Sequence, residues 1–191
     1  PCIVDVEAFA LQNTFEANYD MQSENTALID IGASKTSLNI LKGNSSLFMR
    51  DVSLGCGQIN QKIMSLIECS FEEAEQLKYG DKPERLTQED LKGIVSSVVT
   101  EWCTEIRRAL DFFYSTYPED QIKRIILSGG GANIDEFREL LAAEASAEVE
   151  SINPFKNFGL DKKKFDDAFI KQIAPQAAIS MGLAMRKVDD K

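Results

Sequence analysis

Residues 30–41 read DIGASKTSLNIL, which is the end of one apolar strand, a tight turn and a second, alternating strand. Glycine and serine in the turn supply the backbone freedom and the local hydrogen bonds that a short connection needs. A second turn signal follows at residues 42–45, KGNS, so the sequence predicts three consecutive strands in an antiparallel meander. The predicted strands cover residues 27–31, 36–41 and 47–52.

Helices dominate the chain after the meander, and capping residues mark where they begin. Ser70 with Glu73, and Asn133 with Glu136, have the spacing of a capping box. Thr87 caps a long helix that keeps its apolar spacing until Pro118. Further helices are predicted after residue 58 and over residues 162–170, Pro175 opens the last helix, and strands are predicted at residues 122–127 and near Val149. This mixture indicates an α/β fold.

The first residues are strand-like. PCIVDV at residues 1–6 is followed at once by a helical pattern with apolar residues Ala8, Leu11, Phe15 and Ala17. A domain rarely begins inside its own core, so we expect that a preceding N-terminal portion of the protein is missing from this chain.

Composition excludes several classes of function. Acidic residues outnumber basic ones by 31 to 21, the formal net charge is −10, and the lysines at 162–164 read as a solvated helix face flanked by acids, so no basic surface for nucleic acid is predicted. The chain has no histidine, and its four cysteines have no CxxC spacing, which argues against a zinc site. No apolar run approaches the roughly 20 residues of a membrane helix. The four cysteines, which form no CxxC pair, fit a protein of the reducing cytoplasm.

The turn after the first strand of the meander could bind phosphate. Asp30 ends that strand and could hold Mg²⁺, usually through water, while Gly32 lets the backbone come close to a ligand. Ser34, Lys35 and Thr36 could contact phosphate oxygens. An ordinary hairpin with glycine and serine in its turn would have the same sequence.

Two further motifs have comparable alternatives. Gly129, Gly130 and Gly131 lie between a buried strand and a helix, where free N–H groups favour an anion or a ribose, although a strand-to-helix turn that needs positive φ would also use glycine. Glu75 and Lys78 are three residues apart on one helix face and could grip a ribose hydroxyl and an adenine ring. They could equally form a surface ion pair.

The order of these segments resembles the second half of proteins in the actin–Hsp70–sugar kinase superfamily. The likeness is carried by VDVEAFAL, DIGASKTSLNIL, LGCGQINQKI, FEEAEQLK, IILSGGGANI and PQAAISMGLAM, which cover nearly the whole chain and are most similar to the FtsA and especially the PilM families. The resemblance implies an actin-like (ribonuclease H-like) ATPase lobe with a mixed sheet flanked by helices and a small helical subdomain. It also implies three parts: residues 1–24, the last strand of the first lobe and an interlobe helix; residues 25–56 with 120–191, the core subdomain; and residues 57–119, the helical subdomain.

The resemblance also assigns roles to residues. It implies that Asp30 faces Mg²⁺ and that the last helix is the second connector between lobes. Glu7 lies near the position of a catalytic, water-orienting acid in some actin-like proteins, although a structural role is the preferred interpretation. The implied ATP contacts are Gly32, Ser34, Lys35 and Thr36 at the phosphates, Gly55 and Gly57 along the cleft, Glu75 and Lys78 at the nucleoside, and Gly129, Gly130 and Gly131 at the adenosine.

The function implied by the resemblance is that of a cytoplasmic scaffold of type IV pilus assembly. Such a protein binds ATP and Mg²⁺ with weak or no ATPase activity. It joins the inner-membrane alignment complex through partners, including the PilN cytoplasmic N-terminal segment and other inner-membrane pilus assembly proteins, without inserting into the membrane. The first phosphate loop and most of the PilN groove belong to the lobe that this chain lacks, so we expect weak or no ATP binding by the chain alone.

Three alternatives remain at this stage. A small-molecule kinase of the same superfamily would take its general base and substrate contacts largely from the other lobe. An FtsA-like filament protein of cell division would carry a membrane-targeting helix after its last residues. An α/β interaction domain without any ligand is the third.

Overall fold

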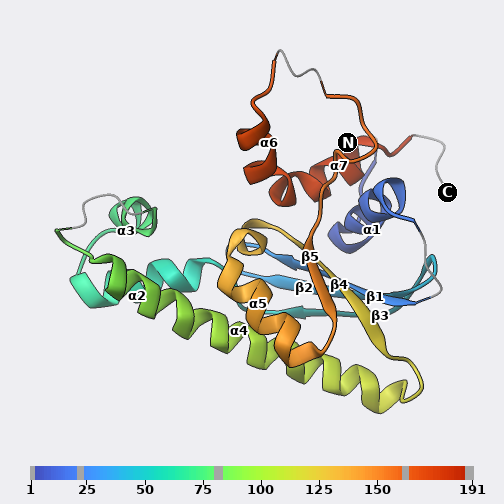
Figure 1. Ribbon diagram of the computed structural model, residues 1–191, viewed down its shortest axis with the longest axis horizontal. Helices are drawn as coiled ribbons and strands as arrows, with labels where there is room; N and C mark the ends of the chain where they lie inside the picture. The colour runs from blue at the N-terminus through green and yellow to red at the C-terminus, as the bar shows by residue number, and fades with distance from the viewer. Residues whose placement is uncertain (1–2, 21–23, 80–83, 161–163, 188–191) are drawn as a thin grey trace.

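A five-stranded mixed sheet forms the centre of the computed structural model, which describes residues 3–20, 24–79, 84–160 and 164–187. Its strand order is β3-β2-β1-β4-β5 (Figure 1). The strands are β1 Asn25–Ile31, β2 Thr36–Lys42, β3 Ser45–Val52, β4 Ile122–Ser128 and β5 Glu148–Ser151. The first three pair in antiparallel fashion, which confirms the predicted meander, whereas β4 pairs parallel to β1 and β5 parallel to β4.

Strand β1 is buried on both faces, which explains why the middle of the strand, residues 27–29, is a continuous apolar run. Ala27, Ile29 and Ile31 belong to one hydrophobic core, and Leu28 belongs to a second core on the opposite face. Because side chains alternate along a strand, one short segment can anchor both cores. Asp30, at the carboxyl end of the strand, is the one residue of β1 that is only partly buried.

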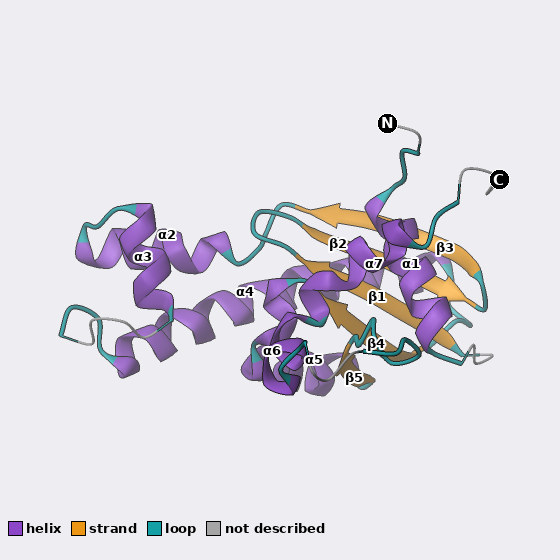
Figure 2. Ribbon diagram, turned by 90° about the horizontal axis from the view of Figure 1, so that it is seen from above, coloured by secondary structure: helices purple, strands orange, loops and turns teal. Residues whose placement is uncertain are grey.

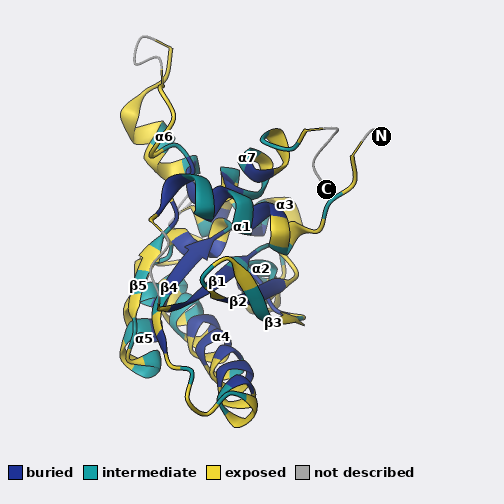
Figure 3. Ribbon diagram, turned by 90° about the vertical axis from the view of Figure 1, so that its right-hand side faces the viewer, coloured by how far each residue is buried: buried dark blue, intermediate teal, exposed yellow. Residues whose placement is uncertain are grey.

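Two layers of helices enclose the sheet (Figure 1). The larger core lies beneath the long helix, whose sheet-facing side is buried along with β4 (Figure 3). The smaller core lies under the first and last helices of the chain. The helices are α4 Gln88–Thr116 and α5 Asp135–Ala145 on one face, and α1 Glu7–Asn18 and α7 Ala178–Ala184 on the other.

Helices α1 and α7 pack unusually close together. A Cβ atom added to Gly182 would lie 1.8 Å from the Ala10 carbonyl oxygen and 2.9 Å from Thr14 Oγ1. The Thr14 hydroxyl donates a 2.6 Å hydrogen bond to the Ala178 carbonyl oxygen. The small residues of the last helix therefore allow its backbone to contact the backbone of the first.

The remaining elements extend beyond the sheet. Helices α2 and α3 lie past its end, together with the first turns of α4 (Figure 2). Ser70 and Thr87 cap α3 and α4 by accepting hydrogen bonds from the backbone N–H groups of Glu73 and Asp90, as predicted. The two helices are α2 Gly57–Ile67 and α3 Phe71–Lys78, and the other elements outside the two layers are η1 Gly130–Asn133, which packs against the ends of β1 and β4, α6 Asp167–Ile173 and η2 Pro175–Ala177.

The predicted strand at residues 1–6 is wrong over the four residues that the structure describes. Ile3, Val4 and Val6 are 37%, 85% and 53% exposed, and residues 3–6 have no strand geometry. A strand persists only when its N–H and C=O groups find a neighbouring strand, and no strand in the described part of the chain pairs with these residues. Pro1 and Cys2 lie outside the described residues.

Three helix starts also differ from their predicted positions. Asn133 does not cap α5, because the short helix η1 intervenes and Ile134 becomes the residue before α5; the Asn133 amide instead donates to the Gln172 carbonyl oxygen. Pro175 opens η2, and α7 begins only at Ala178. The helix predicted at residues 162–170 begins later, where Asp166 accepts from the Phe169 N–H; Lys162 and Lys163 lie outside the described residues, and Lys164 precedes the helix.

In the described part of the chain, no helix is both long enough and apolar enough to cross a bilayer.

Candidate functional site

Two loops that are distant in sequence meet at the turn between β1 and β2. The Cys56 N–H donates a 2.9 Å hydrogen bond to the Gly32 carbonyl oxygen, and the Gly57 N–H donates a 2.7 Å bond to that of Ala33. A Cβ atom on Gly55 would lie 2.6 Å from the Gly32 oxygen, and one on Gly57 would lie 2.9 Å from the Ala33 oxygen. Glycine is therefore needed at both positions so that the two backbones can touch.

The glycine loop after β4 packs against the end of β1. Gly129 has φ of 80°, and a Cβ atom there would lie 2.3 Å from the Ile31 carbonyl oxygen. A Cβ atom on Gly131 would lie 2.5 Å from Ile31 Cγ2. Gly130 differs, since it is exposed and the nearest atom to its Cβ position is Cys56 Sγ at 3.9 Å. Gly130 thus lies on the side of this loop that is turned toward Cys56.

Asp30 lies beside the glycine loop at the carboxyl end of β1. It is opposite Ser128 in the parallel register with β4, and the Ser128 hydroxyl donates a 2.7 Å hydrogen bond to Asp30 Oδ1. Burial raises the pKa of Asp30, the nearby Glu7 carboxylate raises it further, and the Ser128 hydrogen bond and Lys35 lower it. In the described part of the chain, no three acidic, cysteine or histidine side chains come together as a metal cage would require.

Lys35 in the turn is held by two carboxylates. Its ammonium lies 2.8 Å from Glu7 Oε2, at the start of α1, and 3.4 Å from Asp51 Oδ2 in β3. The hydrogen bond with Glu7 is the largest cause of the raised Lys35 pKa. Ser34 is exposed at the tip of the turn, whereas the Thr36 hydroxyl is buried and donates to the Leu54 carbonyl oxygen at 3.1 Å. The Thr36 side chain therefore contacts the neighbouring loop.

Glu75 and Lys78 form a small network with a residue of α2. Glu75 Oε2 lies 2.7 Å from Lys78 Nζ and accepts a 2.5 Å hydrogen bond from the side-chain amide of Asn60. Lys78 also donates to Asn60 Oδ1 at 3.2 Å. The hydrogen bonds from Lys78 and then Asn60 lower the pKa of Glu75. The predicted Glu75–Lys78 pair of α3 is thus held in place by Asn60 of α2.

The Cys56 thiol links the two groups of residues. Burial raises its pKa to about 11, and the thiol is close enough to feel the charges of Lys78, Glu75 and Asp30. The thiol is therefore neutral at physiological pH, and it is near both Asp30 at the end of β1 and the Glu75–Lys78 pair of α3. Cys56 and Asn60 are the site-lining residues that sequence reasoning missed. The only sequence signal for Cys56 was its position between Gly55 and Gly57. No sequence signal marked Asn60.

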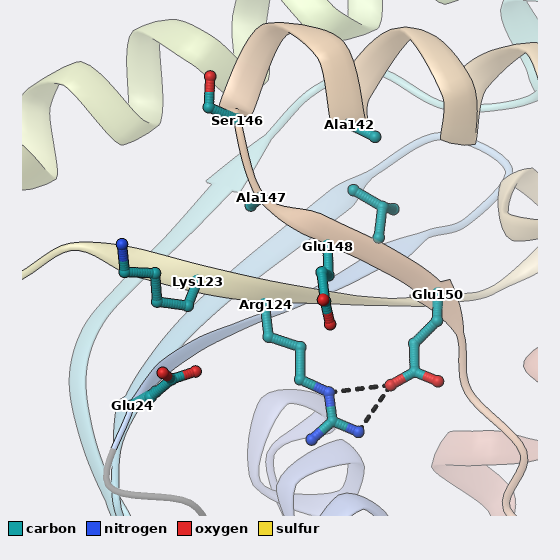
Figure 4. A pocket seen from close by; sticks show the side chains of 9 residues that line it. Glu24, Lys123, Arg124, Ala142, Ser146, Ala147, Glu148 and Glu150 are labelled. Atoms are coloured by element: carbon teal, nitrogen blue, oxygen red, sulfur yellow. Dashed lines mark hydrogen bonds and ion pairs between the residues drawn. The ribbon is translucent and has the colours of Figure 1, made fainter.

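A hollow lies at the other end of the parallel strands. It has a volume of about 890 Å³ and lies where β4 begins, between β5 and the end of α5 (Figure 4). Its Arg124 guanidinium is paired with Glu150 at 2.6 Å and lies over the rings of Phe15 and Tyr19. None of the predicted site residues lines it. Ligands of open α/β sheets bind outside the carboxyl ends of the strands, where Asp30 and the glycine loop lie.

The sequence matches the model of the type IV pilus assembly protein PilM over residues 1–188. The chain belongs to the PilM family. Its structure is similar to a chain of a PilM–PilN type IV pilus biogenesis complex, with a TM-score of 0.83, 27% identity and coverage of 98% of this chain and 53% of that chain.

More distant structures have the same fold. MreB5 of Spiroplasma citri bound to AMPPNP matches with a TM-score of 0.65 and 13% identity, over 96% of this chain and 58% of its own. Ta0583, an archaeal actin homolog, matches with a TM-score of 0.59 and 16% identity, over 93% and 52% respectively. These similarities, with the PilM match, confirm the predicted actin-like fold. This PilM-family chain spans a little over half the length of each of the three proteins.

Proposed function

We propose that this chain forms the second lobe of a cytoplasmic, ATP-binding scaffold of type IV pilus assembly. The observation that carries the proposal is the meeting of three loops, at residues 32–36, 55–57 and 129–131, at the carboxyl ends of β1 and β4. The Glu75–Lys78 pair is bonded to Asn60 in the first turn of α2, the helix that follows the second of these loops. Asp30, Glu75 and Lys78 are all close enough to the partly buried thiol of Cys56 to affect its pKa, and Cys56 Sγ is the nearest atom to a Cβ added to the exposed Gly130. Charged groups on either side of the exposed Gly130 and of Cys56 suit a ligand with a phosphate end and a nucleoside end.

The proposed roles follow from this arrangement. Residues 25–56 with 120–191 form the core subdomain, residues 57–119 the helical subdomain, and residues 1–24 the end of the first lobe with its interlobe helix. The nucleotide contacts are Gly32, Ser34, Lys35 and Thr36 at the phosphates, Gly55 and Gly57 along the cleft, Glu75 and Lys78 at the nucleoside, and Gly129, Gly130 and Gly131 at the adenosine. Thr36 acts through its hydrogen bond with Leu54, which fixes the two phosphate-side loops to each other.

The donor set fits Mg²⁺. Asp30 offers a hard carboxylate oxygen, and Mg²⁺ in phosphate sites keeps several waters and takes only one or two carboxylates from the protein. A bound Mg²⁺ would neutralise phosphate charge next to this carboxylate. We propose that Asp30 orients the waters of the ion.

The ion pair of Glu7 with Lys35 favours a structural role for Glu7 over a catalytic one. Its carboxylate is held by Lys35 at 2.8 Å, so it ties the start of α1 to the phosphate-side turn. A carboxylate committed to an ion pair is a poor acceptor for the proton of an attacking water. We therefore propose weak or no ATPase activity.

The proposed partners are those of the inner-membrane alignment complex. The PilM chain that this one resembles was solved in a complex with PilN, which makes the cytoplasmic N-terminal segment of PilN the first partner to test. We propose that most of its groove belongs to the first lobe, that other inner-membrane pilus assembly proteins also bind, and that these contacts hold the protein peripherally at the membrane without insertion.

Calorimetric titration of MgATP into the full-length protein, before and after addition of a PilN N-terminal peptide, tests this function. We expect saturable 1:1 ATP binding, turnover below about one per minute and saturable peptide binding; the turnover limit lies far below the typical enzyme range. Rapid phosphoryl transfer to a small hydroxyl acceptor would favour a kinase instead. Absence of both ATP and peptide binding would contradict the proposal.

Replacing Asp30 with asparagine is expected to weaken Mg²⁺-dependent ATP binding by about tenfold or more, since hydrogen bonds to charged groups contribute roughly 1.5–3 kcal/mol. The same change should raise the melting temperature at pH 7. Burial raises the pKa of the Asp30 carboxyl in the folded protein above the ordinary value of 3.8. The folded protein therefore binds this proton more tightly than the unfolded chain does. Above the raised pKa, the charged carboxylate of Asp30 opposes folding.

The stability gain of Asp30→Asn should therefore shrink as the pH falls through the raised pKa toward 3.8. Melting curves between pH 4 and 8 measure it, and Asp111→Asn, which removes an exposed carboxylate of α4, is the matched control. Equal ATP affinity of the Asp30→Asn and wild-type proteins would remove Asp30 from the site.

A further inference from the structure

Asn60 of α2 has no role in the proposed function as stated above, yet it is 1% exposed and lies at the centre of the Glu75–Lys78 network. We propose that Asn60 is a positioning residue, which holds Glu75 and Lys78 in the geometry that recognises the ribose hydroxyls of a bound ribonucleotide. This inference rests on the proposed nucleotide site and adds to it a determinant of sugar specificity.

The hydrogen-bond pattern gives Asn60 control over both partners. Its amide N–H₂ donates to Glu75 Oε2 at 2.5 Å, and its carbonyl accepts from Lys78 Nζ at 3.2 Å. Lys78 donates to the same Glu75 oxygen at 2.7 Å, so the three side chains close a ring. Only a side chain that both donates and accepts can complete this ring.

The ring leaves acceptor capacity on the carboxylate. Asn60 and Lys78 both donate to Oε2 and the Tyr79 side chain is a further donor to the carboxylate, whereas a carboxylate has about four acceptor positions on its two oxygens. The Glu75 side chain is 39% exposed, so it can be reached by a ligand, while Lys78 is 18% exposed. An ionised carboxylate is acceptor-only, which suits a partner that brings hydroxyl donors, such as a ribose with both its 2′ and 3′ hydroxyls.

Long side chains need such a fixed point. Glu75 and Lys78 lose rotational freedom about several bonds when they adopt one geometry, and this entropy cost reduces the stability of an isolated, exposed ion pair. Asn60 is immobilised by burial, and it lies three residues after Gly57, whose N–H is bonded to the phosphate-side turn at Ala33. Helix α2 therefore sets the distance between the phosphate end of the site and the ribose end.

The test compares MgATP with its 2′-deoxy analogue by calorimetry on the full-length protein. We expect the wild-type protein to prefer ATP by about tenfold, because a site built for a hydroxyl donor is left with an unpaired charged acceptor by the deoxy sugar. Asn60→Ala should reduce this preference to about twofold or less, mainly by weakening ATP binding.

Asn60→Asp provides a second variant of the same size. It keeps an acceptor for Lys78 but loses the donor to Glu75 and places a second negative charge beside it, so it should also lose the preference. Lys62→Ala is the control on the same helix, because Lys62 is bonded to Ser97 and Glu101 of α4 and is absent from the ring. It should keep the wild-type preference for ATP.

Retention of the preference in both Asn60 variants would overturn the positioning role, even if their melting temperatures fall. An equal loss of preference in Lys62→Ala would also overturn it, since the effect would then belong to the stability of α2. If the wild-type protein binds neither nucleotide, the proposed function fails and the role of Asn60 fails with it.

Discussion

Replacement of Gly182 by alanine is expected to reduce the free energy of unfolding by about 3 kcal/mol or more, at the upper end of the overpacking range. The added methyl group would lie 1.8 Å from the Ala10 carbonyl oxygen and 2.5 Å from its carbon, both of which are backbone atoms of α1. Rotation of a side chain cannot relieve such a contact. The two helices must separate, which also breaks the hydrogen bond from Thr14 to Ala178.

Thermal and denaturant unfolding of the full-length protein measure this loss. The matched control is Gly93→Ala, since Gly93 lies inside α4 and an added Cβ meets no atom within 4 Å. There the same substitution should stabilise the protein by about 0.5–1 kcal/mol through helix propensity. Equal effects of the two substitutions would mean that the close packing of α1 on α7 does not limit stability.

Replacement of Gly129 by alanine is expected to reduce the free energy of unfolding by a similar amount and to abolish nucleotide binding. Gly129 has φ of 80° and ψ of −179°, a region open essentially to glycine alone, and its added Cβ would lie 2.3 Å from the Ile31 carbonyl oxygen. We expect a loss of about 3 kcal/mol from strain and overlap together. The glycine loop would move away from Asp30, and MgATP binding would be lost with it.

Gly130→Ala separates binding from stability in the same loop. Its added methyl group meets nothing nearer than Cys56 Sγ at 3.9 Å, so stability should change by less than about 0.5 kcal/mol. MgATP affinity should nevertheless fall, because the methyl group enters the proposed nucleotide space. Unchanged affinity of Gly130→Ala in calorimetry would argue that the nucleotide does not approach this loop.

The core of the fold could be predicted from sequence because local signals agreed with the tertiary structure. The meander was found from the turn residues Gly32 and Gly43 together with alternating apolar residues, and the capped helices from Ser70 and Thr87. The strand expected at residues 1–6 failed because an apolar run specifies no strand without a partner to pair with. The prediction that Asn133 caps α5 was wrong because a single turn of 3₁₀ helix, η1, moved the start of α5 along the chain. So short a turn leaves little pattern in the sequence.

The candidate site was predictable only in part. Glycines and charged pairs could be noticed along the chain, but their purpose depends on what they approach in space. Gly55 and Gly131 serve close contact with other parts of the protein, which no sequence spacing reveals. Asn60 is a buried polar residue on an otherwise ordinary amphipathic helix, so its partners on α3 became visible only when the two helices were packed together.

The pairing of β1 with β4 has a consequence for the order in which the protein folds. Asp30 and Ser128 are 98 positions apart, so at ordinary rates of synthesis the meander leaves the ribosome roughly 5–20 s before its first strand, β1, gains β4 as a second neighbour. During that interval β1 has an unpaired, strongly apolar edge, which is the feature most prone to pairing with another chain. Closing a parallel pair over so long a loop is also slow. The nascent chain is therefore most exposed to aggregation before β4 emerges, and the strand that ends this exposure is the one that brings Ser128 to Asp30.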